Sequence, residues 1–121
     1  MLTGWLTSAI AVRIAAAVGL IGVGLGAFGA HGLEELLTAN ERMETWRTAV
    51  LYHLVHAVAM LALAFRTPLP RGAFTWFLLG VLIFSGSLYL LSVTGVRWLG
   101  AITPLGGVAF LLGWGWLLIR G

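Results

Sequence analysis

The stretch AIAVRIAAAVGLIGVGLGAFGA at residues 9–30 decides the fold of this chain. Its only charged residue, Arg13, lies near its beginning. A helix needs about 20 mostly apolar residues to cross the roughly 30 Å hydrocarbon core of a bilayer, and this stretch is long enough. Three further apolar stretches follow at about 46–65, 73–92 and 98–119. The sequence therefore predicts four transmembrane helices.

The composition agrees with a membrane protein and excludes several other classes. Of the 121 residues, 60% are hydrophobic and 9% are charged, whereas a soluble domain averages about 25% charged residues. So few charges cannot build a water-facing surface, which excludes a soluble globular enzyme and a disordered chain. The net charge of +3 comes from seven scattered arginines, so we expect no nucleic-acid partner. The absence of cysteine removes disulfides, iron–sulfur clusters and thiol catalysis.

The connections between the apolar stretches predict how the helices are arranged. Residues 66–72 and 93–97 form short links, and short links make neighbouring helices antiparallel. Because lipid cannot satisfy free backbone groups, each apolar stretch should be a helix. We therefore predict an all-α integral membrane protein, an up-and-down four-helix transmembrane bundle that forms one domain, residues 1–121.

The longer link at residues 32–45 has a pattern of its own. Its leucines recur at helical spacing opposite two glutamates: Leu33, Leu36, Leu37, Glu34 and Glu35. This pattern predicts a short amphipathic helix lying on the membrane surface between the first and second spans. Thr38 and Glu41 have the spacing of a capping box that would open the second span, and Asn40 is a competing cap. Glu41 and Glu44 would then lie in the first turn of that span.

The arginines suggest an orientation in the membrane. One side of the predicted bundle carries four of them, Arg13, Arg66, Arg71 and Arg120, and the other side carries three, Arg42, Arg47 and Arg97. This small excess predicts that both termini are cytoplasmic. A secretory signal cleaved after Ala27-x-Gly29 is the alternative for the first stretch. Against it, the amino end has no early positive charge and the apolar run is long for a signal.

Small residues form one face of the first helix. Gly22, Gly26 and Ala30 recur every four residues, a spacing that lets two helix backbones approach closely. This face packs either within the bundle or against another subunit. Four thin helices bury little surface among themselves, so we expect a homo-oligomer or a membrane-protein partner as well as the lipid bilayer.

Tryptophans lie toward the ends of several segments: Trp5, Trp46, Trp98, Trp114 and Trp116. Tryptophan is enriched at both membrane–water interfaces, so we interpret these side chains as an aromatic belt and not as a cofactor site. Pro104 lies about one turn after the start of the fourth stretch. Because proline removes a helical hydrogen bond and clashes with the preceding turn, it predicts a kink or a late helix start.

The polar residues inside the apolar stretches are the candidates for a site. No Asp or Glu lies there, although proton-coupled pumps and cation transporters usually keep a carboxylate at depth. His53 and His56 are three residues apart and share a helix face. The candidate ligand-binding residues are His31, Tyr52, His56, Ser85 and Ser87. The serines would bond to a carbonyl one turn back or to a neighbouring helix, or line a path for a ligand.

The histidines leave three interpretations open. They could be hydrogen-bonded inside the bundle or at the headgroups, they could bind a ligand or pass a proton, or they could hold a metal or a haem iron. His-x-x-His alone is a weak signal, so we assign no metal site, and the cofactor stays unknown.

Four phrases of the sequence carry a resemblance. They are GAFGAHGL at 26–33, WRTAVLYHLVHA at 46–57, FSGSLYLL at 84–91 and LGAITPLGG at 99–107. Together and in this order they resemble the domain-of-unknown-function family 423, the YgdD-like and transmembrane protein 256 proteins. The resemblance implies a small multi-pass protein of the bacterial plasma (inner) membrane and implies no reaction. His31 and His56 match the phrases, and His53 matches them less securely.

Three functions are consistent with these observations. The first is an oligomeric protein that binds or transports a small ligand, an ion or a lipid, and we favour it. The second is a structural or assembly subunit of a larger membrane complex, and the third is a haem-binding or metal-binding membrane protein. We expect no enzyme, since the sequence has no buried carboxylate pair, no nucleophile beside a convincing base and no phosphate-binding loop.

Overall fold

The computed structural model describes residues 4–121, which form helices and links without a strand. Four helical segments within them are long and apolar enough to cross a membrane. The predicted all-α four-helix membrane fold is therefore confirmed; residues 1–3 of the predicted single domain lie outside the described residues. The elements are α1 (Ser8–His31), α2 (Glu34–Ala39), α3 (Met43–Ala64), α4 (Arg71–Gly80), η1 (Val81–Ser85), α5 (Gly86–Thr94) and α6 (Leu99–Arg120).

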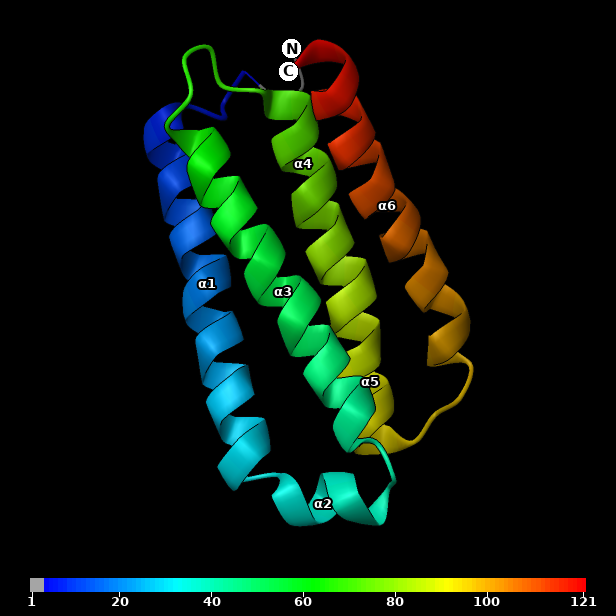
Figure 1. The fold of residues 1–121 in the computed structure, drawn as a ribbon. Helices are drawn as coiled ribbons and strands as arrows, with labels where there is room; N and C mark the ends of the chain where they lie inside the picture. Colours follow the sequence, from blue (N-terminus) through cyan, green and yellow to red (C-terminus); the bar gives the residue numbers. More distant parts are fainter. Residues whose placement is uncertain (1–3) are drawn as a thin grey trace.

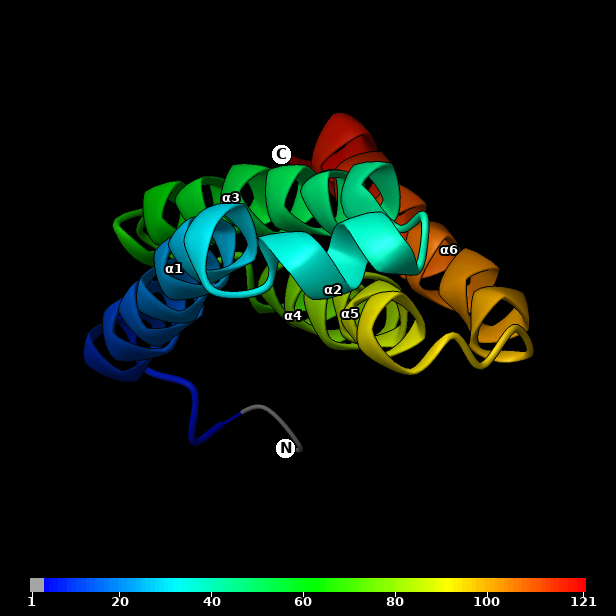
Figure 2. The same cartoon turned by 90° about the horizontal axis from the view of Figure 1, so that it is seen from below.

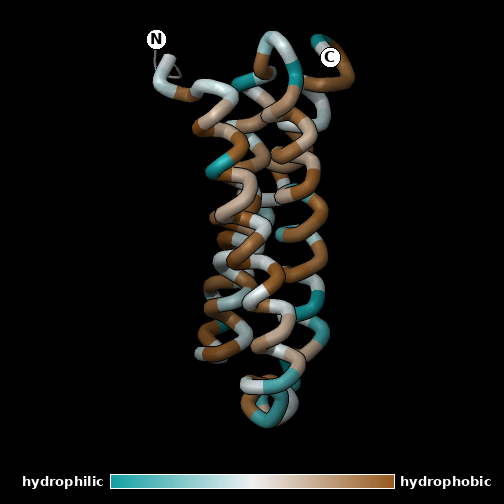
Figure 3. Tube along the Cα trace, turned by 90° about the vertical axis from the view of Figure 1, so that its left-hand side faces the viewer, coloured by the Kyte–Doolittle hydropathy of each residue, from teal (hydrophilic) through white to brown (hydrophobic). Residues whose placement is uncertain are grey.

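The chain runs up and down through the bundle (Figure 1). The α1 helix runs away from the chain ends, α3 returns, the continuous span formed by α4, η1 and α5 runs away again, and α6 returns. Both termini thus lie at one end of the bundle, and α2 crosses the other end (Figure 1). Figure 3 shows hydrophobic residues along the helical shafts and hydrophilic ones gathered at the α2 end.

The helices are not equivalent in their packing. Seen from below, α3 and the α4–α5 span lie in the centre, with α1 on one flank and α6 on the other (Figure 2). The α1 helix packs mainly against α3, and α6 packs against α4 and η1. The α3 helix packs against α1 and the third span, and it reaches α6 through its side chains, as His56 does at Trp114.

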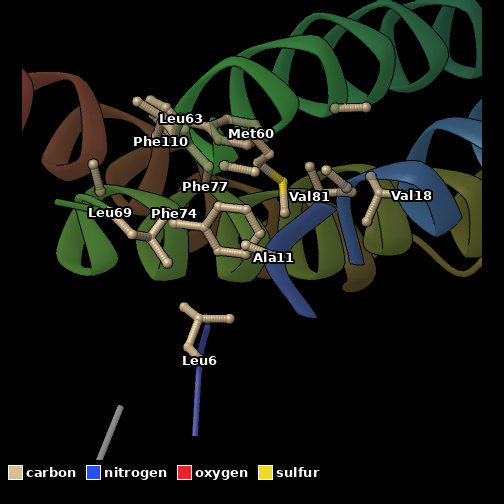
Figure 4. Close-up of a cluster of buried hydrophobic side chains, with 14 residues drawn as sticks. Leu6, Ala11, Val18, Met60, Leu63, Leu69, Phe74, Phe77, Val81 and Phe110 are labelled. Atoms are coloured by element: carbon tan, nitrogen blue, oxygen red, sulfur yellow. The ribbon is translucent and has the colours of Figure 1, made fainter. Parts of the chain in front are cut away.

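The apolar core, drawn in close-up in Figure 4, includes Leu6 before α1 and Leu69 before α4 and so lies toward the end of the bundle where the chain begins and ends. Leu6 and Ala11 meet Met60 of α3 and the rings of Phe74 and Phe77 of α4 in one cluster of buried side chains. Both rings are no more than 1% exposed. Nearer the α2 end, hydrogen bonds between helices replace much of this apolar packing.

The link between α2 and α3 differs from the sequence prediction. The backbone N–H of Arg42 donates to Leu37 O at 2.8 Å, that of Glu41 donates to Thr38 O, and Glu41 has φ of 56°. This is a Schellman ending, in which a residue after the helix takes the left-handed conformation. The predicted capping box is therefore wrong: Thr38 to Glu41 end α2 and do not begin α3. The first turn of α3 contains Glu44 without Glu41, and no side chain caps it.

The same link is held by Asn40, which was predicted as a competing cap of α3. Asn40 instead ends α2, and its side-chain amide donates to Ser92 O of α5 at 3.1 Å. The apolar face of α2 is buried at Leu37, whereas Glu34 and Glu35 are exposed. The amphipathic pattern thus correctly predicted a helix, and a long-range hydrogen bond decides where it ends.

The fourth span begins before its proline. Because α6 runs from Leu99 through Pro104, the expectation of a late helix start is wrong. The amides of Leu99, Gly100 and Ala101 are bonded to carbonyls three residues back, in the preceding link. The first turn is therefore satisfied upstream of Pro104, and the proline costs the helix only one backbone donor.

Candidate functional site: a groove between α3 and α6

A groove of about 400 Å³ lies between α3 and α6, and η1 contributes to its wall. It is mostly apolar and aromatic. Its lining residues are Tyr52, His56, Phe84, Pro104, Gly107, Val108, Phe110, Leu111 and Trp114. A neighbouring hollow of about 300 Å³ shares three of them, Tyr52, His56 and Trp114. We call the two together the α3–α6 groove.

His56 forms the polar floor of this groove and is 3% exposed. Trp114 donates its indole N–H to His56 Nε2 at 3.0 Å, and His56 Nδ1 lies 2.8 Å from Tyr52 O. An indole N–H only donates and a carbonyl only accepts, so the imidazole carries its proton on Nδ1 and is neutral. Its ring stacks on Phe110 with centroids 3.7 Å apart. His56 is therefore locked in one tautomer and one orientation.

Tyr52 differs from every other polar residue of the groove because its hydroxyl has no hydrogen-bond partner among residues 4–121. Its ring packs near Phe84, with centroids 4.8 Å apart, and the residue is 41% exposed. Tyr52 lies nine residues after the start of α3, about 14 Å along the helix at a rise of 1.5 Å per residue. Tyr52 thus lies near the middle of the α3 span, at a depth where a bilayer is hydrocarbon.

The wall opposite Tyr52 is shaped by an irregularity in the third span. Val81–Ser85 form one π-helical turn, and Phe84 lies in it. Gly106 of α6 packs directly on the backbone of Phe84, where a Cβ would collide. Wide turns of this kind are frequent at functional sites. The π-helical turn and Gly106 together let α6 approach the third span closely, while Phe84 lines the groove.

The two serines predicted as ligand-binding residues lie outside this groove. Ser85 Oγ donates to Ala49 O of α3 at 2.8 Å and Ser85 is fully buried. Ser87 Oγ donates to Phe84 O and lies 2.6 Å from Thr103 Oγ1 of α6. Both serines thus connect the third span to its neighbours.

His31 is the remaining predicted ligand-binding residue, and it lies apart from His56. It ends α1 and is exposed, whereas His56 is buried within α3. Among residues 4–121 no group of three His, Cys, Asp or Glu side chains is placed to hold a metal ion. Of the five candidates, the structure brings together Tyr52 and His56.

The predicted small-residue face of α1 meets α3. A Cβ on Gly22 would lie 2.7 Å from Leu54 Cδ2 and 3.0 Å from His53 Cδ2, and one on Gly26 would lie 3.1 Å from Val50 Cγ1. Ala30 is exposed at the end of the same face. Gly22 and Gly26 therefore allow close packing inside the bundle, and a role of this face between subunits stays a prediction.

Sequence reasoning missed a hydrogen-bonded junction of three helices. His53 of α3 lies 2.8 Å from Val18 O of α1 through Nε2, and 2.8 Å from Tyr89 Oη of α5 through Nδ1. The carbonyl must accept from Nε2–H, so the Tyr89 hydroxyl donates to Nδ1. A small hollow of about 190 Å³ reaches this junction from outside. His53 and Tyr89 were visible in the sequence as polar residues, but their meeting with a valine carbonyl of α1 was not.

The aromatic-belt interpretation needs a correction at Trp46. This side chain is 4% exposed, packs on Gly29 and donates its N–H to Leu25 O of α1 at 3.0 Å. The belt interpretation is therefore wrong for Trp46, because a glycine on α1 lets its ring enter the bundle. Trp114 also has a partner inside, His56. By contrast, Trp5 and Trp98 are 58% and 65% exposed, as belt residues should be.

Comparison with known proteins identifies relatives of the chain. Residues 25–107 match the family model described as "Protein of unknown function (DUF423)". The chain is 48% identical over 101 residues to the UPF0382 membrane protein YwdK of Bacillus subtilis, covering 78% of this chain and 81% of the relative. It is 40% identical over 121 residues to the UPF0382 inner membrane protein YgdD of Escherichia coli, covering 94% and 90%. No solved structure matches the chain.

Proposed function

Since this chain belongs to the DUF423 family of membrane proteins, whose name states no function, we propose that it binds an apolar molecule in the α3–α6 groove. It is a multi-pass inner-membrane protein, so such a ligand would enter sideways from the bilayer. The ligand would carry one hydrogen-bonding group, most simply a carbonyl oxygen, that accepts from the Tyr52 hydroxyl. The cytoplasmic placement of both termini stays a prediction.

The observation that carries this proposal is the hydroxyl of Tyr52, which has no hydrogen-bond partner within the described part of the chain, residues 4–121. In hydrocarbon a polar group without a hydrogen bond costs several kcal/mol on the scale of water-to-alkane transfer, about 4–8 kcal/mol for a hydroxyl. Among residues 4–121 no buried side-chain nitrogen or oxygen lacks a partner, and Tyr52, which is 41% exposed, is not buried by the protein itself. Its hydroxyl therefore faces whatever fills the groove, and a ligand that accepts its hydrogen bond would satisfy it.

The groove walls favour an apolar and partly planar ligand. Phe84 and Phe110 pack against each other in the groove wall with ring centroids 5.5 Å apart, and Gly107 adds no side chain on the α6 side. His56 and Trp114 already satisfy one another, so the groove offers one free polar contact. We therefore propose binding or carriage of the ligand and no chemical reaction on it.

Photolabelling with an alkyl benzophenone tests this proposal. The probe dissolves in the bilayer, its carbonyl can accept from Tyr52, and irradiation attaches it to neighbouring C–H groups. We expect saturable labelling of α3 and α6 beside the groove, read by mass spectrometry of the fragments. Tyr52→Phe should weaken labelling about fivefold, the effect of one hydrogen bond of about 1 kcal/mol.

A pair of glycine variants controls for changes in packing. Gly107→Leu should block labelling by filling the groove, whereas Gly24→Leu should not, because no atom lies within 4 Å of a Cβ at that α1 position. Labelling that does not saturate and is equal in all variants would contradict the proposal. If the groove is instead covered by a partner helix, the protein is an assembly subunit; a second protein would then copurify and be released by Gly107→Leu.

A further inference from the structure

A second groove, of about 330 Å³, lies on the other side of α3, against α1. It is separate from the α3–α6 groove and shares only Leu51 with the hollow beside Tyr52. Its residues, which define the α1–α3 groove, are Gly26, Gly29, Ala30, Met43, Trp46, Arg47, Val50, Leu51 and Leu54. Arg47 is the one charged residue among them.

The groove changes from charged to apolar along its length. Arg47 lies four residues after the first residue of α3 and Leu54 lies eleven after it, about 6 Å and about 16 Å along the helix. Arg47 thus lies near the start of the span, where its long side chain can extend toward the lipid headgroups, and aliphatic side chains continue toward the bilayer centre. A phospholipid has the same profile, with a phosphate above an acyl chain.

The guanidinium of Arg47 has N–H groups available to bind a phosphate. Its Nη1 lies 3.2 Å from Glu44 Oε1, and both side chains are exposed. An exposed pair of this kind contributes little to stability, and the guanidinium has further N–H groups to donate. On α1, Ala30 is exposed and leaves room for an acyl chain, whereas Gly29 is covered by Trp46.

We propose that the α1–α3 groove holds an anionic phospholipid, with its phosphate on Arg47 and one acyl chain along Val50 and Leu54. The occupant comes from the surrounding bilayer, since the groove lies between two membrane-spanning helices. Glu44 competes with the phosphate for Arg47. The preference for an anionic lipid therefore depends on this one arginine.

Native mass spectrometry of the protein in mixed micelles tests this inference. The probes are phosphatidylglycerol and phosphatidylcholine of the same acyl chains. We expect the wild type to retain phosphatidylglycerol preferentially and Arg47→Gln to lose that preference about fivefold, as expected for one arginine near an anionic surface. Arg97→Gln is the matched control and should have no such effect, because Arg97 is exposed and belongs to the α5–α6 link, which lies at the same end of the bundle as α2 (Figure 1).

Two further variants address the acyl chain and the competing carboxylate. Ala30→Leu should reduce retention of both lipids by filling the groove, whereas Ala27→Leu, at an exposed position of α1 outside it, should not. Glu44→Gln should strengthen retention of phosphatidylglycerol. Equal losses in Arg47→Gln and Arg97→Gln would overturn the proposal, as would displacement of the lipid by inorganic phosphate. A dimer that Ala30→Leu dissociates, without change in bound lipid, would assign the groove to a second copy and overturn it too.

Discussion

Polar residues on the two sides of α3 differ in whether their hydrogen bonds are satisfied within the bundle. On the side that faces α1, His53 has both ring nitrogens bonded to other helices, and Gly22 packs against its ring. On the side that faces α6, His56 is equally well bonded, but the hydroxyl of Tyr52 beside it has no partner in residues 4–121 and is open to a groove of about 400 Å³. The polar ring of His53 is thus fully bonded to other helices, whereas the hydroxyl of Tyr52 is open to a groove.

This difference separates structural polar residues from candidates for function. In a membrane, helix association relies on close packing and on interhelical hydrogen bonds, because lipid is as apolar as the helix surfaces. The bonds of His53 fulfil that requirement on the α1 side. An open hydroxyl contributes nothing to association, so its retention at mid-bilayer depth is better explained by binding.

Filling a glycine on each side should give the largest contrast in stability. Gly22→Leu places a side chain where Leu54 and the fixed ring of His53 already lie, and such overpacking costs about 3 kcal/mol. Gly107→Leu meets only Phe84 at 4.0 Å and should change stability by less than about 0.5 kcal/mol. Unfolding by sodium dodecyl sulfate in mixed micelles, followed by circular dichroism, measures both. Equal losses would mean that the α6 side is as closed as the α1 side.

Hydropathy was sufficient to predict the spans and their order. The predicted start of α1 at residue 9 lies one residue from the observed Ser8, and the short links forced antiparallel neighbours as expected. The end of α2 at Asn40 was harder to predict, because the Asn40 amide donates to Ser92 O, 52 residues away in the chain. A local pattern cannot reveal a partner at that separation.

The site was predictable only in its residue types. Tyr52 and His56 stood out as polar groups in an apolar stretch, but nothing in the sequence indicated that Trp114 would turn inward to His56. The serines show the same limit: their hydroxyls were expected to bond to a carbonyl or a neighbouring helix, and only packing decided that Ser85 meets Ala49. Which helices lie side by side depends on close approaches such as Gly106 on Phe84.

Two tryptophans near the same end of the bundle test the corrected interpretation of the belt. Trp46→Phe removes the donor to Leu25 O and part of a ring that fills the space above Gly29, so we expect a loss of about 1.5 kcal/mol. Trp98→Phe, at a position 65% exposed, should lose less than about 0.5 kcal/mol. The same unfolding assay compares them. A larger loss for Trp98 would restore the belt as the main role of both residues.

The two tyrosines give the smallest but most selective contrast. Tyr89→Phe removes the hydroxyl that donates to His53 Nδ1 and leaves that buried nitrogen without a partner, which should cost about 1 kcal/mol. Tyr52→Phe removes a hydroxyl that bonds to no described residue and should leave the free energy of unfolding unchanged, or raise it slightly, because an unpaired group has left the hydrocarbon. If Tyr52→Phe destabilises the ligand-free protein as much as Tyr89→Phe does, the hydroxyl already has a structural partner and the binding proposal loses its basis. If only Tyr89→Phe destabilises the protein while only Tyr52→Phe weakens photolabelling, then stability and binding depend on opposite sides of one helix.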